Sequence, residues 1–153
     1  MTRVKPPLLP PVPDHVDLHV AVLAGRLMAE IREVFAGEDW DGLRQSHFRL
    51  LALVPPEGIT VTDLAERLGM TKQAAGQFVT QLEGSGHLET QAVPADRRLR
   101  VVTRTALGDR TNRAVTARIR RIERAWARRV GEDRYAEFRD VLTEIAVGPD
   151  RAR

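Results

Sequence analysis

A chain of 153 residues, 42% hydrophobic and 29% charged, has the composition of a globular domain and not of a disordered chain. It contains no cysteine, which excludes disulfides, thiolate metal sites and thiol chemistry. No apolar run approaches the ~20 residues of a membrane span. Because the amino-terminal residues also lack the apolar segment of a signal peptide, we expect a cytoplasmic protein.

The positive charge is concentrated in one part of the chain. Residues 97–129 contain twelve arginines and two acidic residues, a net charge of +10; the whole chain carries +3, so the other 120 residues carry −7. A clustered positive field attracts a polyanion, and nucleic acid is the commonest one in the cytoplasm. A solvated, arginine-rich helix face explains the same charge equally well, so charge alone leaves both interpretations open.

The amino-terminal part predicts an arm followed by a helix. Residues 1–13 contain five of the nine prolines, so we expect an extended arm, either a free tail or a segment lying across a partner subunit. A helix is predicted within residues 14–36, with Asp14 or Asp17 as its cap. Its apolar residues recur every three or four positions on more than one face, so it is expected to pack on two neighbours.

A second helix is predicted over residues 43–54, with His47 on its apolar face. Pro55 and Pro56 end it, because the residue before a proline disfavours the α region. A short extended segment, residues 58–61, follows.

Two further helices are predicted close together. Thr60, with an acidic residue three positions later, resembles a capping box for a short helix that begins at 61 to 63. Gly69 can take the left-handed conformation that ends this helix. Thr71 can then cap a fourth helix, residues 72–83.

The remainder predicts a hairpin and two helices. Residues 87–93 and 99–104 are rich in residues typical of strands, and the five residues between them, 94–98, form a charged tip. A long helix runs to about residue 129, and a last helix covers roughly 132–146.

This order indicates a mainly α (α+β) fold, a helix-turn-helix followed by a wing. Ala65 and Ala75 supply the small residues that closely crossing helices need, and Gly69 supplies the turn. The fourth helix then presents a polar face that fits the major groove, where glutamine pairs with adenine and lysine with guanine or phosphate. The residues of this face, with its cap, are Thr71, Lys72, Gln73, Gly76, Gln77, Thr80 and Gln81.

At three places the sequence resembles the MarR-type transcription regulators. Residues 62–71 are similar to their helix-turn-helix, Asp96-Arg97-Arg98 to their wing, and residues 102–108 to the exit into their long dimerisation helix. The element order matches over roughly residues 17–147. The resemblance implies a homodimer with dimerisation helices at 14–36 and 106–147, a winged DNA-binding region at 41–105 and a tail at 148–153.

The resemblance also implies the function. The protein is expected to regulate transcription, as a ligand-responsive repressor on a pseudo-palindromic operator, and so to associate with the nucleoid. Arg97 or Arg98 would enter the minor groove, braced by Asp96. Two features depart from the family: Gln77 and Gln81 stand where arginine is common, and Gly76 lies inside the recognition helix. Gly76 allows either close approach of DNA or tight helix packing.

In this family a small-molecule pocket lies between the dimerisation helices and the winged region. His19, Trp40, Arg44 and His47 are the residues that could line it here, and an arginine suits an aromatic or otherwise anionic effector. We expect no catalytic residue, metal site or cofactor, because no phosphate loop or hydrolase motif is present. The alternative function is a winged-helix module that binds another protein and no longer binds DNA; the neutral recognition helix favours it and the arginine pair of the wing opposes it.

Overall fold

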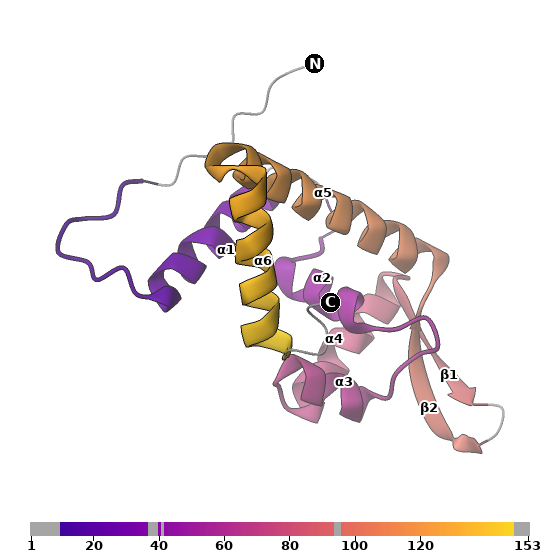
Figure 1. Ribbon diagram of the computed structural model, residues 1–153. Coiled ribbons are helices and arrows are strands. Elements are labelled where there is room, and N and C mark those ends of the chain that lie inside the picture. The colour runs from indigo at the N-terminus through magenta and orange to yellow at the C-terminus, as the bar shows by residue number, and fades with distance from the viewer. Residues whose placement is uncertain (1–9, 37–39, 41, 94–95, 149–153) are drawn as a thin grey trace. The chain divides into compact units, whose positions relative to one another are not determined.

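The computed structural model describes residues 10–36, 40, 42–93 and 96–148. Within these residues the chain forms six helices and one two-stranded sheet, which confirms the predicted mainly α fold (Figure 1). The predicted arm and tail, residues 1–13 and 148–153, lie largely outside the described residues. The elements are α1 (Val20–Ala36), α2 (Gln45–Leu53), α3 (Val61–Leu68), α4 (Lys72–Gly84), β1 (Leu88–Val93), β2 (Asp96–Arg104), α5 (Ala106–Val130) and α6 (Glu132–Val147).

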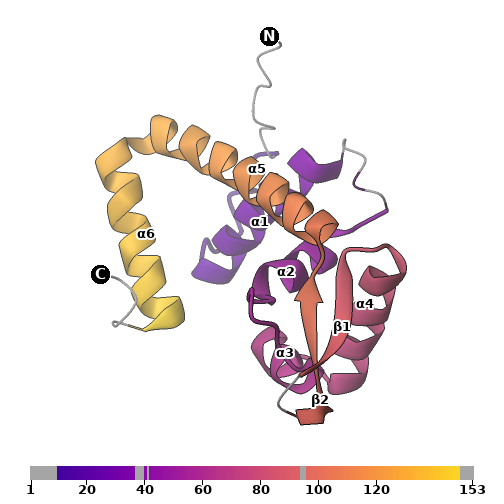
Figure 2. The ribbon, with the colours of Figure 1, turned by 90° about the vertical axis from the view of Figure 1, so that its right-hand side faces the viewer.

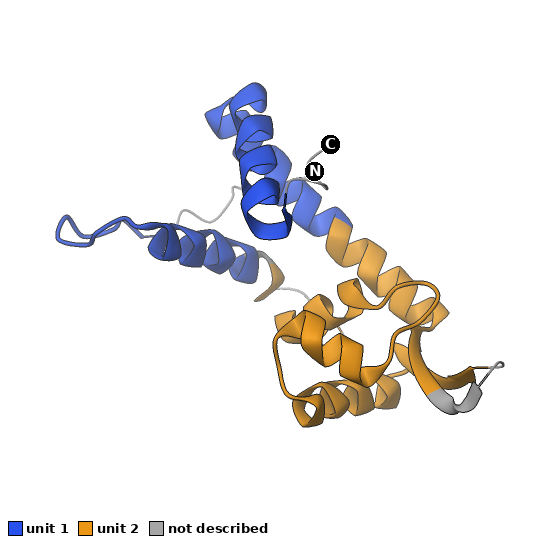
Figure 3. Ribbon diagram, turned by 60° about the horizontal axis from the view of Figure 1, so that its bottom comes forward, with its two compact units in different colours: residues 1–34, 117–153 blue, residues 35–116 orange. Residues whose placement is uncertain are grey.

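The chain divides into two compact units (Figure 3). One unit, residues 35–116, contains α2, α3, α4, the hairpin and the first turns of α5. We call it the winged unit. The other, residues 1–34 and 117–153, contains α1 without its last residues, the rest of α5 and α6. We call it the helical unit.

The winged unit has one apolar core. Leu50 and Leu51 of α2, Leu64 of α3, Leu82 of α4 and Val102 of β2 are all fully buried in it. Each such side chain contributes roughly 1.5–3 kcal/mol relative to an exposed one. The apolar faces predicted for these helices therefore meet at one centre and fix α4 on the unit.

The caps and the turn of the helix-turn-helix are as predicted. The Thr60 hydroxyl oxygen accepts from the backbone N–H of Asp63 at 3.1 Å and donates to that residue's carboxylate at 2.8 Å. Gly69 ends α3 with φ of 65°, in the left-handed region that glycine adopts without strain. Thr71 caps α4 by accepting from the N–H of Ala74 at 3.2 Å.

The wing differs from the prediction at its tip. β2 begins at Asp96 and not at residue 99, so three residues of the predicted five-residue tip belong to the strand. The pairing of the two strands explains the earlier start of β2. Ala92 lies opposite Arg100, but the next residue, Val93, lies opposite Asp96. The residues of β2 between these two pairs, 97–99, therefore form an irregularity in the ladder. The predicted extended segment at 58–61 is reduced to a bridge between Ile59 and Val102, because α3 already begins at Val61.

Two helices start later than predicted. α1 begins at Val20 and not at residue 14 to 17; the N–H groups of Val22 and Leu23 bond to the carbonyl of His19, so this residue closes the first turn. α2 begins at Gln45 and not at residue 43, because Arg44 has extended backbone and its N–H donates to the ring of His47.

The junction between the wing and α5 is tightly bonded. Nε of Arg104 donates to Asp109 at 2.7 Å, and its Nη1 donates to the carbonyls of Leu51, at 2.9 Å, and Val54. The end of β2 is thereby tied to α2 and to the first turn of α5. Gly108 lies so close to the preceding loop that a Cβ there would stand 2.0 Å from the His87 carbonyl oxygen.

Gly108→Ala is therefore expected to lower the free energy of unfolding by at least about 1–3 kcal/mol, since backbone must move to admit the methyl group. Gly76→Ala is the control: no atom lies within 4 Å of its added Cβ, and alanine in a helix interior should raise stability by up to about 1 kcal/mol. Urea unfolding measures both. Equal stability of Gly108→Ala and the wild type would contradict the close contact.

The helical unit leaves much of its apolar surface uncovered. Ile122, Trp126 and Ala127 of α5 are buried, whereas α6 has no buried residue. The exposed large apolar side chains of this unit are Leu18, Val20, Leu23, Met28, Val130, Phe138, Val141, Leu142, Ile145 and Val147. Among the described residues, no helix is both long and apolar enough to cross a membrane.

Candidate nucleic-acid interface

The recognition-helix residues predicted from the sequence share one polar face of α4. Lys72, Gln73 and Gln77 are exposed, as are Thr71 and Thr80. The opposite face holds Ala75, Val79 and Leu82, which are buried in the core of the winged unit. The buried face fixes the helix, and the polar face is left open to a partner.

Three of these residues already have partners within the protein. The Thr71 hydroxyl caps α4, and the Thr80 hydroxyl donates to the Gly76 carbonyl at 3.0 Å. The Gln81 amide oxygen lies 3.0 Å from Nε2 of His47. Among the described residues, the side chains of Lys72, Gln73 and Gln77 have no such partner, so they are the ones free to bond a ligand.

His47 connects α2 to the recognition helix. Its Nδ1 accepts the backbone N–H of Arg44 at 2.8 Å, which leaves Nε2 protonated to donate to Gln81. The ring also meets Phe78 edge-on, with centroids 5.5 Å apart. His47 is thus a buried histidine with both nitrogens bonded. His47 and Gln81 are 34 residues apart, and no sequence pattern links residues at that separation, so this contact could not be predicted.

The structure bears on one of the two roles that the sequence left open for Gly76, which is tight packing between helices. No heavy atom lies within 4 Å of the position its Cβ would take. The glycine is therefore not required for packing between helices. It leaves the backbone of α4 bare on the polar face, where another molecule could approach closely.

The close crossing of α3 and α4 depends on small residues, as predicted. Ala65 is 4% exposed and Ala75 is fully buried. The wing lies beside these helices, and the start of β2 lies at the same end of the winged unit as α3 (Figures 1 and 2). The helix-turn-helix and the wing could therefore contact one extended partner together.

The predicted wing residues Asp96, Arg97 and Arg98 lie in β2. Their side chains are outside the described part of the structure. Arg100, two positions further along β2, is exposed and was not among the predicted residues.

Two of the four predicted pocket residues line one cavity. Arg44 and His47 border a space of about 570 Å³, together with Gly42, Leu43, Ser46, Phe78, Gln81 and Ser85. Trp40 instead packs on Phe35 and Phe48, with ring centroids 5.4 and 5.2 Å away. His19 belongs to the helical unit. No three histidine or acidic side chains of the described ranges could share a metal ion.

Comparison with known proteins identifies relatives of this arrangement. A family model described as the MarR family matches residues 41–99, which span α2, the helix-turn-helix and much of the wing. A search of curated proteins gave no match.

Solved structures match over most of the chain. The PcaV transcriptional regulator from Streptomyces coelicolor, in complex with its natural ligand, is 26% identical with a TM-score of 0.65, over 90% of this chain and 98% of that one. CouR from Rhodococcus jostii RHA1, bound to p-coumaroyl-CoA, is 21% identical with a TM-score of 0.66, over 84% and 90%. The transcriptional repressor CouR bound to a 23-mer DNA duplex is 23% identical with a TM-score of 0.68, over 84% and 92%.

Proposed function

We propose, from the premise that this chain is a MarR-type winged-helix regulator, that it forms a homodimer and binds double-stranded DNA at a specific sequence. The observation that carries the proposal is the open polar face of α4, on which Lys72, Gln73 and Gln77 are exposed and unpartnered among the described residues. The regulator acts as a repressor whose DNA affinity depends on a small effector, and it works on the nucleoid.

In this proposal α4 lies in the major groove. Gln73 and Gln77 read adenine through paired hydrogen bonds, and Lys72 bonds guanine or phosphate. Gly76 lets the helix backbone come close to the DNA, since nothing covers it. Thr71, Thr80 and Gln81 hold the helix in place through their internal bonds and border the same face.

The wing contributes affinity more than base recognition. Arg97 and Arg98 enter the minor groove, where guanidinium groups respond to groove width and negative potential. Asp96 braces them by a charge-assisted hydrogen bond. The position of the wing beside the helix-turn-helix supports this assignment (Figure 2).

The exposed apolar surface of the helical unit supports the dimer. Phe138 is 44% exposed, Leu142 49% and Ile145 79%, all on α6. Apolar patches of this kind mark association sites. A two-fold dimer that pairs the helical units would cover them, and would present two recognition helices to a pseudo-palindromic operator.

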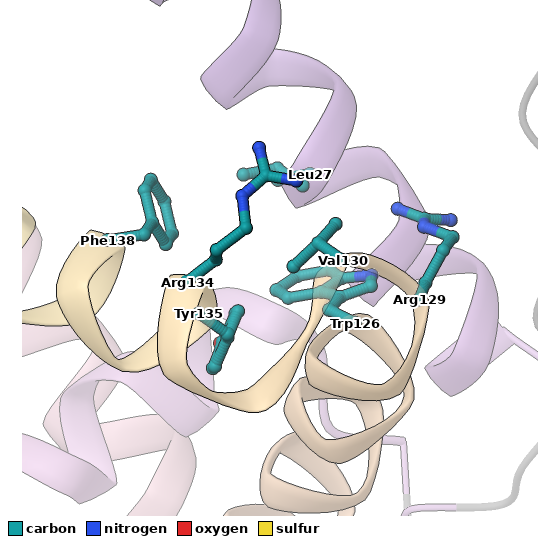
Figure 4. Close-up of a pocket in the computed structure, with 7 residues that line it drawn as sticks. All are labelled: Leu27, Trp126, Arg129, Val130, Arg134, Tyr135 and Phe138. Atoms are coloured by element: carbon teal, nitrogen blue, oxygen red, sulfur yellow. The ribbon is translucent and has the colours of Figure 1, made fainter.

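A cavity in the helical unit belongs to the same surface. It measures about 260 Å³ and is lined by Leu27, Trp126, Arg129, Val130, Arg134, Tyr135 and Phe138 (Figure 4). Burial and the nearby Glu123 carboxylate raise the pKa of the Tyr135 hydroxyl, which is therefore neutral at physiological pH. We assign the cavity to side chains of the second subunit, because its apolar lining includes Phe138 and Val130 of the exposed set.

The effector is proposed to occupy the cavity beside His47. Because both ring nitrogens of His47 are engaged, Arg44 is the cationic side chain left to bond an anionic ligand there. Phe78 offers an aromatic face in the same lining. Aromatic carboxylates are therefore the first compounds to screen. PcaV was solved with its natural ligand and CouR with p-coumaroyl-CoA, which supports an effector for a regulator of this fold.

Gln77→Ala is expected to relax base preference at one position in each half-site, by about 1–3 kcal/mol, because a paired contact to adenine is lost. Competition between operator and single-base variants measures this. Gln81→Ala is the matched comparison: its amide is held by His47, so it should keep the preference at that position. Unchanged discrimination in Gln77→Ala would refute the assignment of that residue.

A further inference from the structure

Most of the concentrated positive charge plays no part in the proposed operator contact. Of the twelve arginines in residues 97–129, the wing uses Arg97 and Arg98. Eight of the others lie on α5. The sequence could not decide between a solvated helix face and a nucleic-acid contact, and the structure adds three observations.

The first observation is the arrangement of these arginines. At 100° per residue, Arg120, Arg121, Arg124 and Arg128 fall within about 100° of the circumference of α5. We call these four residues the arginine stripe. From Arg120 to Arg128 it extends about 12 Å along the helix. Arg110 and Arg113 have the spacing that continues the same face toward the start of α5.

The second observation is that the stripe is electrostatically unsatisfied. All four side chains are exposed. Among the described residues no carboxylate lies within ion-pair distance of them; the ion pairs are Arg104 with Asp109 and Arg139 with Glu123. Like charges three and four residues apart on a helix repel one another, so the stripe destabilises α5 until an anion neutralises it.

The third observation concerns the other side of α5. Ile122 and Trp126, on the side away from the stripe, are buried, at 7% and 8% exposure. A helix that binds a lipid surface inserts its apolar face, and this apolar face is already covered. The stripe therefore suits a polyanion that is bound by charge alone, without an apolar contact.

We infer that the arginine stripe binds the phosphate backbone of double-stranded DNA, independently of sequence. Guanidinium groups bond phosphate oxygens in pairs, which suits arginine better than lysine. Successive arginines at 120, 124 and 128 are about 6 Å apart along the axis, a regular row that a chain of phosphates can follow. This contact is additional to the base-reading face of α4, and it does not depend on which bases α4 prefers.

The test is the salt dependence of binding to a duplex of random sequence, measured by fluorescence anisotropy. The variant Arg120→Gln/Arg124→Gln/Arg128→Gln removes three charges and keeps good helix formers. Arg120→Lys/Arg124→Lys/Arg128→Lys is the control, because it keeps the three positive charges at the same positions.

Each phosphate contact contributes about 0.9 to the slope of log K against log salt, and a dimer presents each of the three arginines twice, so the stripe variant should lose about 5.4. The ratio of wild-type to variant affinity should then fall about 2,000-fold between about 50 and 200 mM salt. The control should keep the wild-type slope. An unchanged slope in the stripe variant overturns the inference. Sedimentation of the stripe variant as a monomer also overturns it, because the arginines would then be shown to contact the second subunit.

The same titrations separate this inference from the proposed function. If the wild type prefers operator over random duplex while the stripe variant keeps its slope, only the stripe assignment fails. If the wild type binds no duplex at all, the proposed function fails as well.

Discussion

Phe138→Glu/Leu142→Glu is expected to convert the protein into a monomer that no longer binds its operator. Both side chains are about half exposed on α6, a helix with no buried residue in the single chain. In a two-fold interface each appears twice, so four apolar contacts are lost. Because each side chain is already about half buried in the single chain, the interface gains roughly half of the 1.5–3 kcal/mol of full burial for each, or about 3–6 kcal/mol for the four. Losing this raises the dissociation constant by roughly 10²- to 10⁴-fold, even before the added charges are desolvated.

Sedimentation at micromolar concentration and a gel shift with operator DNA measure the two effects. Glu137→Gln/Asp140→Asn is the control, because it changes the charge of exposed α6 residues by the same magnitude, in the opposite direction, and removes no apolar side chain. A wild-type protein that sediments as a monomer would contradict the dimer. A monomeric variant that binds operator normally would separate dimerisation from DNA binding.

Arg97→Ala/Arg98→Ala is expected to weaken binding to operator and random DNA alike. A dimer presents each arginine twice, so the slope of log K against log salt should fall by about four, and by about two for Arg98→Ala alone. Asp96→Ala should give a milder effect, since it removes only the brace. The dimer and the thermal stability should not change, because these residues lie at the start of β2, beside the turn of the hairpin.

Salt titrations with the operator duplex and with a random duplex measure the affinity and the slope, and a thermal melt of each variant measures its stability. Surface ion pairs within the hairpin are the alternative role for the two arginines, and these are worth under about 1 kcal/mol. If the double variant retained both its operator affinity and its salt slope, the assignment of the wing to the minor groove would have to be abandoned.

Local signals predicted the helix-turn-helix because each of them acts over a few residues. The Thr60 and Thr71 caps bond N–H groups three positions later, and Gly69 takes a left-handed φ that few other residues tolerate. Apolar periodicity placed Ala74, Ala75, Phe78, Val79 and Leu82 on the buried face of α4. The structure confirms Ala75, Val79 and Leu82 as buried, whereas Ala74 and Phe78 are partly exposed.

The errors arose where distant residues decide the local structure. The start of β2 depends on its register with β1, which the irregularity after Ala92 sets. The start of α2 depends on a ring nitrogen of His47. Gln81 has the polar character and spacing of a base-reading residue, and its amide oxygen also bonds a histidine on another helix, a contact that spacing does not predict. The periodicity of apolar and polar residues along the sequence does not reveal any of these contacts.

For the candidate site, too, local patterns predicted some features and contacts between distant residues decided others. Periodicity identified the polar face of α4, and the structure selected Lys72, Gln73 and Gln77 as its free members. It also removed the packing role of Gly76, since the neighbouring space is empty. The pocket residues came from a resemblance, and of these only Arg44 and His47 line one cavity. A cavity depends on the shape of the whole unit, which residue spacing does not encode.

Selection of binding sites from a pool of random duplexes, with the mass of the selected complex, tests the central claim most directly. We expect enrichment of a pseudo-palindromic sequence whose half-sites lie about one helical turn, or about 10 base pairs, apart. Each half-site should contain adenine where Gln73 or Gln77 reads it, and each duplex should hold two copies of the chain. A pool that remains random at physiological salt, or a complex with a single copy, would contradict a dimeric, base-reading regulator.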